Sequence, residues 1–136
     1  MVTTENIKVF RRDGNLGNCP VAADTLIPIG TLAYLDATGF LTGTAGKFFG
    51  VAYELGDNAG GADGDIAIDC WQEGVFQFAS SGLTQANVGD PAYGVDNDTI
   101  GLSASSAFVG IIVRVISATL CEVKLQQSQA IAAATA

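Results

Sequence analysis

Gly30-Thr31-Leu32-Ala33-Tyr34 returns later in the chain as Gly89-Asp90-Pro91-Ala92-Tyr93, and this recurrence is the strongest sequence guide to the fold. After each copy comes a short acidic stretch, Asp36 to Gly39 in the first and Asp96 to Asp98 in the second. Asp, Asn and Gly in such stretches favour tight turns, because their side chains bond the local backbone or tolerate unusual dihedral angles. Each copy therefore begins as a strand followed by a turn.

The similarity continues beyond the turns. Phe49-Gly50-Val51-Ala52 matches Phe108-Val109-Gly110-Ile111 with a shift of one residue. Each copy then ends in an alternating stretch, Ile66 to Cys70 and Cys121 to Leu125, in which every second residue is apolar. The pattern predicts an all-β protein, a small barrel or sandwich with a two-copy internal repeat.

Further apolar stretches bounded by turn residues are typical of short strands. These strands are predicted at Thr31 to Leu35, Phe40 to Leu41, Phe48 to Leu55, Ile66 to Trp71, Val75 to Phe78, Pro91 to Val95, Ile100 to Leu102, Phe108 to Ile116 and Leu120 to Leu125. Helices are expected to be short at most. The one candidate before the C-terminal tail, Ser80 to Val88, is weakened by Gly82.

Composition favours one soluble folded domain. The chain has 136 residues, of which 49% are hydrophobic and 15% charged, so a disordered chain is excluded. The net charge is −8 and the pI is near 4.1, which disfavours binding to the phosphate backbone of nucleic acids. No run of apolar residues is long enough to span a bilayer, and no secretory signal is expected.

The three cysteines, Cys19, Cys70 and Cys121, are too far apart in sequence for a C-x-x-C pair. An odd number at wide spacing argues against a disulfide framework or a zinc site. Cys70 and Cys121 fit small buried apolar residues better than reactive thiols. Reduced thiols agree with a protein made in a cytoplasm.

Residues for catalysis are scarce. The chain contains no histidine, which removes the commonest general base and the usual nucleophilic triads. Gly43 to Lys47 resembles part of a phosphate-binding loop, but Leu41 and Phe48 stand where the motif requires Gly and Ser or Thr. We therefore expect a hairpin turn there. No catalytic residue, cofactor site or metal site is assigned, and the chain is predicted not to be an enzyme.

Aspartates cluster in two Gly-rich regions, and carboxylates in such loops can bind calcium. The clusters contain Asp57, Asp63, Asp65, Asp69, Asp90, Asp96 and Asp98. The stretch from Asp96 matches a calcium loop at its first, third and sixth positions, but Ile100 and Ala107 fall where the loop needs ligands. Solvated turn aspartates are favoured, and the sequence leaves the calcium question open.

The first residues differ in charge from the rest. Three of the six basic residues, Lys8, Arg11 and Arg12, lie in the first twelve positions, where basic and apolar residues partly alternate. The sequence thus divides into an arm (1–18), a β-rich body (19–125) and a Gln- and Ala-rich tail (126–136). The arm is either a contact segment or a solvated lead-in. If it is a contact segment, its contact residues are Ile7, Lys8, Val9, Phe10, Arg11 and Arg12.

Trp71 is the sole tryptophan, and strand alternation places it opposite Ile66, Ile68 and Cys70. A tryptophan on the outer face of a strand is either covered by a loop or lies at a subunit contact, where tryptophan is enriched. We favour the subunit contact.

From about Val21 to Leu125 the chain resembles a family of small phage proteins related to the lambda-type head decoration proteins. Five motifs in order carry the resemblance: Ile29-Gly30-Thr31-Leu32-Ala33-Tyr34, Phe49-Gly50-Val51-Ala52, Glu73-Gly74-Val75-Phe76, Gly89-Asp90-Pro91-Ala92-Tyr93 and Val109-Gly110-Ile111. The stretch before Val21 is longer than the family pattern, and the tail after Leu125 has no counterpart in it.

The resemblance implies a small β-barrel or β-tulip-like fold, and it implies a decoration (cement) protein on the outer capsid surface of a virion. It implies homotrimers at three-fold and quasi-three-fold positions, the major capsid protein as partner, and no role in binding nucleic acid or membranes. Residues 3–12 would then lie on the capsid as an added strand. The alternative is another phage structural protein, in a tail, a spike or a surface module that binds glycans.

Overall fold

The fold is described from a computed structural model, which describes residues 15–44, 46–104 and 106–126. Twelve strands and one short 3-10 helix, Gln85–Asn87, occur in these residues. The strands are β1 (Leu16–Pro20), β2 (Leu26–Ile27), β3 (Leu32–Leu35), β4 (Leu41–Thr42), β5 (Lys47–Ala52), β6 (Gly56–Asp57), β7 (Ala67–Trp71), β8 (Val75–Ala79), β9 (Pro91–Gly94), β10 (Ile100–Gly101), β11 (Ala107–Ser117) and β12 (Leu120–Leu125). The prediction of an all-β protein is confirmed.

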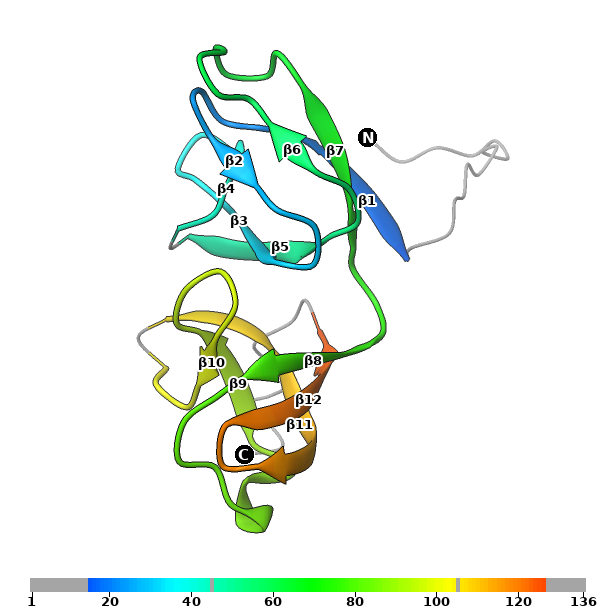
Figure 1. The fold of residues 1–136 in the computed structure, drawn as a ribbon, viewed down its shortest axis with the longest axis vertical. Coiled ribbons are helices and arrows are strands. Elements are labelled where there is room, and N and C mark those ends of the chain that lie inside the picture. The colour runs from blue at the N-terminus through cyan, green and yellow to red at the C-terminus, as the bar shows by residue number, and fades with distance from the viewer. Residues whose placement is uncertain (1–14, 45, 105, 127–136) are drawn as a thin grey trace, which may run out of the picture.

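Two five-stranded antiparallel sheets carry the internal repeat. The first sheet has the order β1-β7-β5-β3-β4, and the second, taken from its β8 edge, has the order β8-β12-β11-β9-β10. We call β1 to β7 the first copy and β8 to β12 the second copy. Each strand of the first sheet thus has an equivalent in the second. Figure 1 shows the two copies stacked, with the first copy at the top.

The β-bulges of the two copies fix the alignment of the repeat. Tyr34 pairs with Phe48, and after an irregularity Ala33 pairs with Gly50. In the second copy Tyr93 pairs with Phe108, and after an irregularity Ala92 pairs with Gly110. The equivalent of Phe108 is therefore Phe48, and the predicted match to Phe49 was wrong by one residue. A bulge inserts one residue into one strand of a pair, and sequence similarity alone does not show where it lies.

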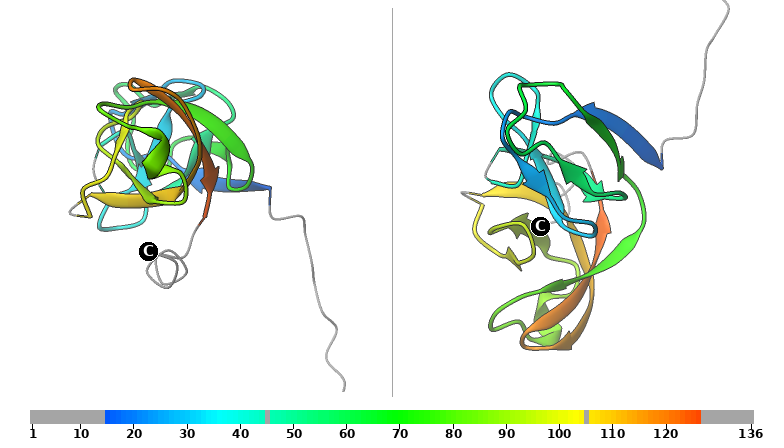
Figure 2. Two further views of the ribbon diagram at one scale, coloured as in Figure 1. Left: turned by 90° about the horizontal axis from the view of Figure 1, so that it is seen from below. Right: turned by 45° about the horizontal axis from the view of Figure 1, so that its top comes forward.

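Neither sheet forms a closed barrel in the described part of the chain. The edges of each sheet meet at a single parallel bridge, Val21 with Leu41 in the first copy and Ala79 with Thr99 in the second. No ladder between named strands continues from either bridge. The sheets therefore curl and stay open, which corrects the barrel expectation. Figure 2 (right) shows the chain crossing from β7 to β8 along one side of both copies.

Two buried clusters form the core. The smaller one lies in the first copy and includes Ile27, Leu41 and Ile68. The larger one joins Leu32 and Tyr34 and two other first-copy residues to nine residues of the second copy. Both clusters use residues from alternating positions of the strands, because successive side chains of a strand point to opposite faces of its sheet.

Two hydrogen bonds reinforce the contact between the copies. The Leu32 backbone N–H donates to the Asn97 carbonyl at 2.7 Å. The Tyr34 hydroxyl donates to the Asp96 carbonyl at 2.6 Å, and burial is the main reason that the pKa of this hydroxyl is raised. The β9–β10 turn of the second copy is therefore held on β3 of the first.

Two local expectations need correction. Leu16, Gly17 and Asn18, which we placed in the arm, belong to β1 at the edge of the first sheet. The predicted helix near residues 80–88 is reduced to the 3-10 helix, since Gly82 has a φ of 70° that a right-handed helix does not accommodate. No helix in the described ranges is long and apolar enough to cross a membrane.

Candidate functional site

A pair of exposed apolar side chains occurs at the same place in each copy. In the first copy, Gly30 donates a backbone hydrogen bond to the Ala52 carbonyl at 2.9 Å, and Ile29 and Tyr53 flank this bond. Ile29 is 66% exposed and Tyr53 is 49% exposed. Two more exposed residues, Leu26 and Leu55, lie on and beside the small β2–β6 ladder.

The second copy repeats this arrangement. Gly89 donates to the Ile112 carbonyl at 2.7 Å, and Val88 and Val113 flank the bond. Each of the two valines is 40% exposed. We call Ile29 with Tyr53 the first apolar pair and Val88 with Val113 the second apolar pair.

The same local backbone produces both pairs. Gly30 and Gly89 have φ angles of 82° and 95°, a backbone conformation that residues other than glycine rarely adopt. An equivalent second hydrogen bond follows each glycine, from Ala52 to the Thr31 carbonyl and from Ile112 to the Asp90 carbonyl. The chain thus turns in the same way before β3 and β9, and it leaves an apolar residue exposed before each glycine.

Our sequence interpretation did not assign these pairs. The available signal was an apolar residue directly before the glycine that opens each copy, Ile29-Gly30 and Val88-Gly89. Exposed apolar residues that gather on one surface are typical of contact sites on soluble proteins. The same feature therefore occurs twice in one chain, at equivalent positions of the two copies.

Trp71 lies where the chain passes from the first copy to the second. It is partly buried and packs against the larger core cluster. Its ring contacts Tyr53 edge-on at 5.1 Å between centroids and Phe76 at 6.4 Å, and Phe78 continues the aromatic row. These contacts connect the first apolar pair to the core. The subunit contact predicted for Trp71 stays a prediction.

The predicted arm contacts, residues 7–12, lie outside the described residues. The described chain enters the fold at Asn15, whose carbonyl accepts the Gln72 N–H at 2.7 Å. It continues directly into β1, the edge strand of the first sheet. The arm therefore precedes an edge of the sheet.

Several of the clustered aspartates accept hydrogen bonds that hold the loops in place. Asp57, Asp63 and Asp65 each accept a backbone N–H, at 3.2, 2.8 and 2.9 Å. The pKa of Asp36 is lowered mainly by the Phe40 backbone N–H that it accepts, and that of Asp96 mainly by the backbone N–H of Asp98. Among the described residues no group of three or more Cys, Asp or Glu side chains could hold a metal ion.

The segment after Gly43 leads from β4 to β5, but these two strands do not pair with each other, because each of them pairs with β3. The expected hairpin turn is therefore wrong, since a hairpin joins two strands that pair directly. A strand follows this segment, so no helix N-terminus is placed there to bind a phosphate group. The nucleotide-binding alternative has no structural support at this loop.

All three thiols are buried. Burial is the main cause that raises the pKa of Cys19 and Cys121, and it raises the pKa of Cys70 to about 12. A thiol reacts as its thiolate, so a raised pKa and a buried sulfur both suppress its reactivity. These cysteines act as core residues in this fold.

We expect all three thiols to react slowly with DTNB at pH 8 in the native protein and rapidly in denaturant. Because the pKa of Cys70 is raised above 9.0, its contribution to stability is complete below pH 9 and is lost as the pH rises toward 12. Urea unfolding measured between pH 9 and pH 12 should show this loss as a falling free energy of unfolding. In Cys70→Val the fall over the same pH range should be smaller. Fast labelling of the native protein would contradict this prediction.

Comparisons with protein-family models, with curated proteins and with solved structures found no match. The geometry of the described residues and the motifs of the sequence therefore carry the functional argument.

Proposed function

We propose that this chain is a viral capsid decoration protein that binds the outer capsid surface between capsomers and stabilises the expanded head. The observation that carries the proposal is the pair of equivalent apolar sites, Ile29 with Tyr53 and Val88 with Val113. A chain with two related contact sites can hold two equivalent places on a repetitive shell. Such bridging binds tightly even when each contact is weak, because the second contact forms at high effective concentration.

The charge distribution supports the same role. Residues 15–126 contain twelve carboxylates and three cations, a formal net charge of −9. The segment before them contains Lys8, Arg11 and Arg12 against two carboxylates. An acidic body keeps particles apart in solution, and a basic segment that precedes the edge strand β1 in sequence suits strand addition to a partner. Residues 7–12 are the proposed capsid-contact segment.

The proposed partner is the major capsid protein, and the proposed assembly is a homotrimer at three-fold and quasi-three-fold positions of the virion. Both come from the motif resemblance, in which decoration proteins occupy such positions. The proposed role is structural: the protein ties neighbouring capsomers together and so resists the pressure of the packaged genome.

The two apolar pairs provide the test. We expect Ile29→Asp or Val88→Asp alone to weaken binding to expanded capsid shells by about a hundredfold, because each removes one of the contacts that together give the avidity. Carrying both substitutions should bring binding below what co-sedimentation detects, because residues 7–12 alone then hold the protein. Co-sedimentation of the purified protein with shells that lack it measures the effect.

Val95→Asp is the matched control, since Val95 is 59% exposed and belongs to neither apolar pair. It should bind as the unchanged protein does. Failure of the unchanged protein to sediment with expanded shells, or its absence from the capsid surface in electron cryomicroscopy of virions, would overturn the proposal. Binding that survives the double substitution would exclude the apolar pairs as the contact sites.

A further inference from the structure

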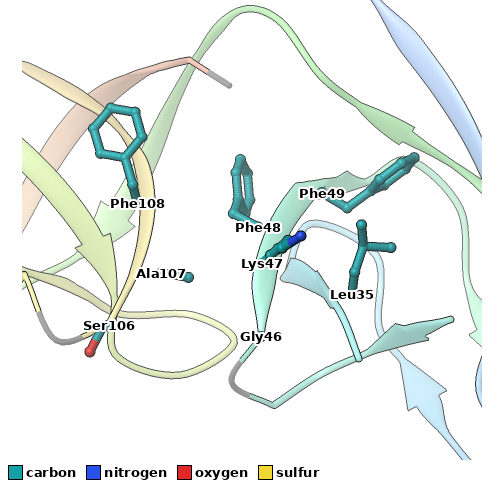
Figure 3. Close-up of a pocket in the computed structure, with 8 residues that line it drawn as sticks. All are labelled: Leu35, Gly46, Lys47, Phe48, Phe49, Ser106, Ala107 and Phe108. Atoms are coloured by element: carbon teal, nitrogen blue, oxygen red, sulfur yellow. The ribbon is translucent and has the colours of Figure 1, made fainter. Parts of the chain in front are cut away.

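An open cleft of about 390 Å³ lies where the two copies face each other. Its lining consists of Leu35, Gly46, Lys47, Phe48, Phe49, Ser106, Ala107 and Phe108. Figure 3 shows Phe48, Phe49 and Lys47 of β5 on one side and Phe108 of β11 on the other. The apolar pairs described above do not line this cleft.

The cleft exists because the repeat is unequal here. The alignment fixed by the bulges makes Phe48 equivalent to Phe108, and therefore Lys47 equivalent to Ala107. Three equivalent positions of each copy thus line the cleft, residues 46–48 and residues 106–108, whereas Leu35 and Phe49 come from the first copy alone. The small side chain of Ala107 leaves open space opposite the longer Lys47, and nothing in the described structure fills it.

The lining combines polar and apolar surface in similar amounts and carries one positive charge. Three phenylalanine rings and Leu35 provide the apolar surface, and Lys47 is one of three cations among residues 15–126. The described residues place no carboxylate within ion-pair distance of Lys47, whereas Arg114 approaches Glu122 at 3.9 Å. Residues 15–126 carry a net charge of −9, so most of their surface repels an anion. Lys47 therefore provides a position in the cleft where a carboxylate of a partner can bind.

A second hollow of about 450 Å³ shares Leu35, Gly46 and Lys47 with the cleft and extends it toward Asp36. The Asp36 carboxylate lies at that end of the second hollow, and one of its oxygens accepts the backbone N–H groups of Thr38 and Phe40 at 2.9 and 3.0 Å, which favours its charged form. A partner carboxylate is therefore expected at the Lys47 side and not beside Asp36. The two hollows share lining residues at Lys47 and both are open to solvent, so an extended peptide segment can lie across them.

We infer that the cleft between the copies binds a segment of a partner protein in which a large apolar side chain stands next to a carboxylate. The apolar side chain enters between Phe48 and Phe108, and the carboxylate pairs with Lys47. The identity of the partner as the capsid surface rests on the proposed function, whereas the chemistry of the cleft does not.

A titration with the fluorescent aromatic sulfonate ANS tests the cleft directly, because this probe combines an apolar body with an anionic group. The unchanged protein should bind it. Ala107→Phe should abolish binding by filling the cleft, and Lys47→Glu should weaken it by about tenfold or more through loss of the charged partner. Lys124→Glu is the matched control, since Lys124 is exposed on β12 and does not line the cleft, and it should bind as the unchanged protein does.

Lys47 is exposed, so its substitution tests the inference even if Ala107→Phe lowers stability. Equal ANS binding by the unchanged protein and Lys47→Glu, or no binding by the unchanged protein, would overturn the inference. Ala107→Phe and Lys47→Glu are then sedimented with capsid shells. Both variants should bind the shells at least about tenfold more weakly than the unchanged protein does. Normal shell binding by both variants would exclude the capsid as the occupant while leaving the decoration role in place. If the unchanged protein fails to bind shells, the proposed function falls and the ANS titration alone decides the chemistry of the cleft.

Discussion

Replacing Gly110 by alanine is expected to lower the free energy of unfolding by about 3 kcal/mol or more. A Cβ atom at this position would lie 2.0 Å from the Lys124 carbonyl oxygen, and a backbone atom in a neighbouring strand cannot move aside as a flexible side chain can. Gly110 follows the bulge in β11, which pairs with both β9 and β12. Any relief must therefore separate strands at the centre of the second sheet. Urea denaturation should show a lower midpoint.

The repeat predicts the same result for Gly50→Ala. Gly50 is the equivalent of Gly110, and its added Cβ atom would lie 2.4 Å from the Trp71 carbonyl oxygen. The matched control is Gly43→Ala, since a Cβ atom there meets nothing closer than the Leu26 carbonyl oxygen at 4.0 Å. Gly43→Ala should leave the midpoint almost unchanged. If Gly50→Ala and Gly43→Ala were equally mild, close packing at the bulge would not be the reason that both copies carry glycine there.

Strand positions were predictable because alternation reports directly on burial. Cys121, Val123 and Leu125 were expected to point inward, and their exposed fractions are 0%, 0% and 5%. The turns at Asp36 and Asp96 were predictable for a chemical reason, since an aspartate that begins a turn accepts the backbone N–H groups that follow it. These signals are local, so a single sequence contains them.

What the sequence could not show depends on pairing between distant segments. Gly17 and Asn18 are residue types that favour turns, yet they pair with Cys70 and Asp69 as part of β1. The position of the bulge likewise depends on which residue of β5 faces Tyr34. The openness of the sheets and the small β2–β6 ladder are also set by tertiary contacts, which override local propensity.

The candidate site was hidden for a different reason. Ile29 and Val88 are apolar residues, and apolar residues are expected inside unless their surroundings are known. Their exposed fractions show that both side chains are on the surface, and the equivalent hydrogen bonds from Gly30 and Gly89 show that they occupy equivalent positions in the two copies. The cleft was hidden because its walls come from β5 and β11, which lie far apart in sequence.

The two copies should unfold as one unit, and Leu32→Ala should show this. Leu32 is fully buried in the cluster that combines both copies, so removing its side chain should cost about 3 kcal/mol. This is a large part of the roughly 5–15 kcal/mol that stabilises a typical domain. The loss should reach the second copy, because its β9–β10 turn is held on β3 by Leu32 and Tyr34.

Two probes separate this outcome from independent unfolding of the copies. Trp71 fluorescence reports on the junction, and amide hydrogen exchange in β11 and β12 reports on the second copy. In Leu32→Ala both should change at the same lower urea concentration, in a single transition. Val95→Ala, at an exposed position, should leave both unchanged. If β11 kept its original protection while the first copy unfolded, the shared core would not couple the copies, and the chain would lack the rigidity that the proposed bridging of capsid positions requires.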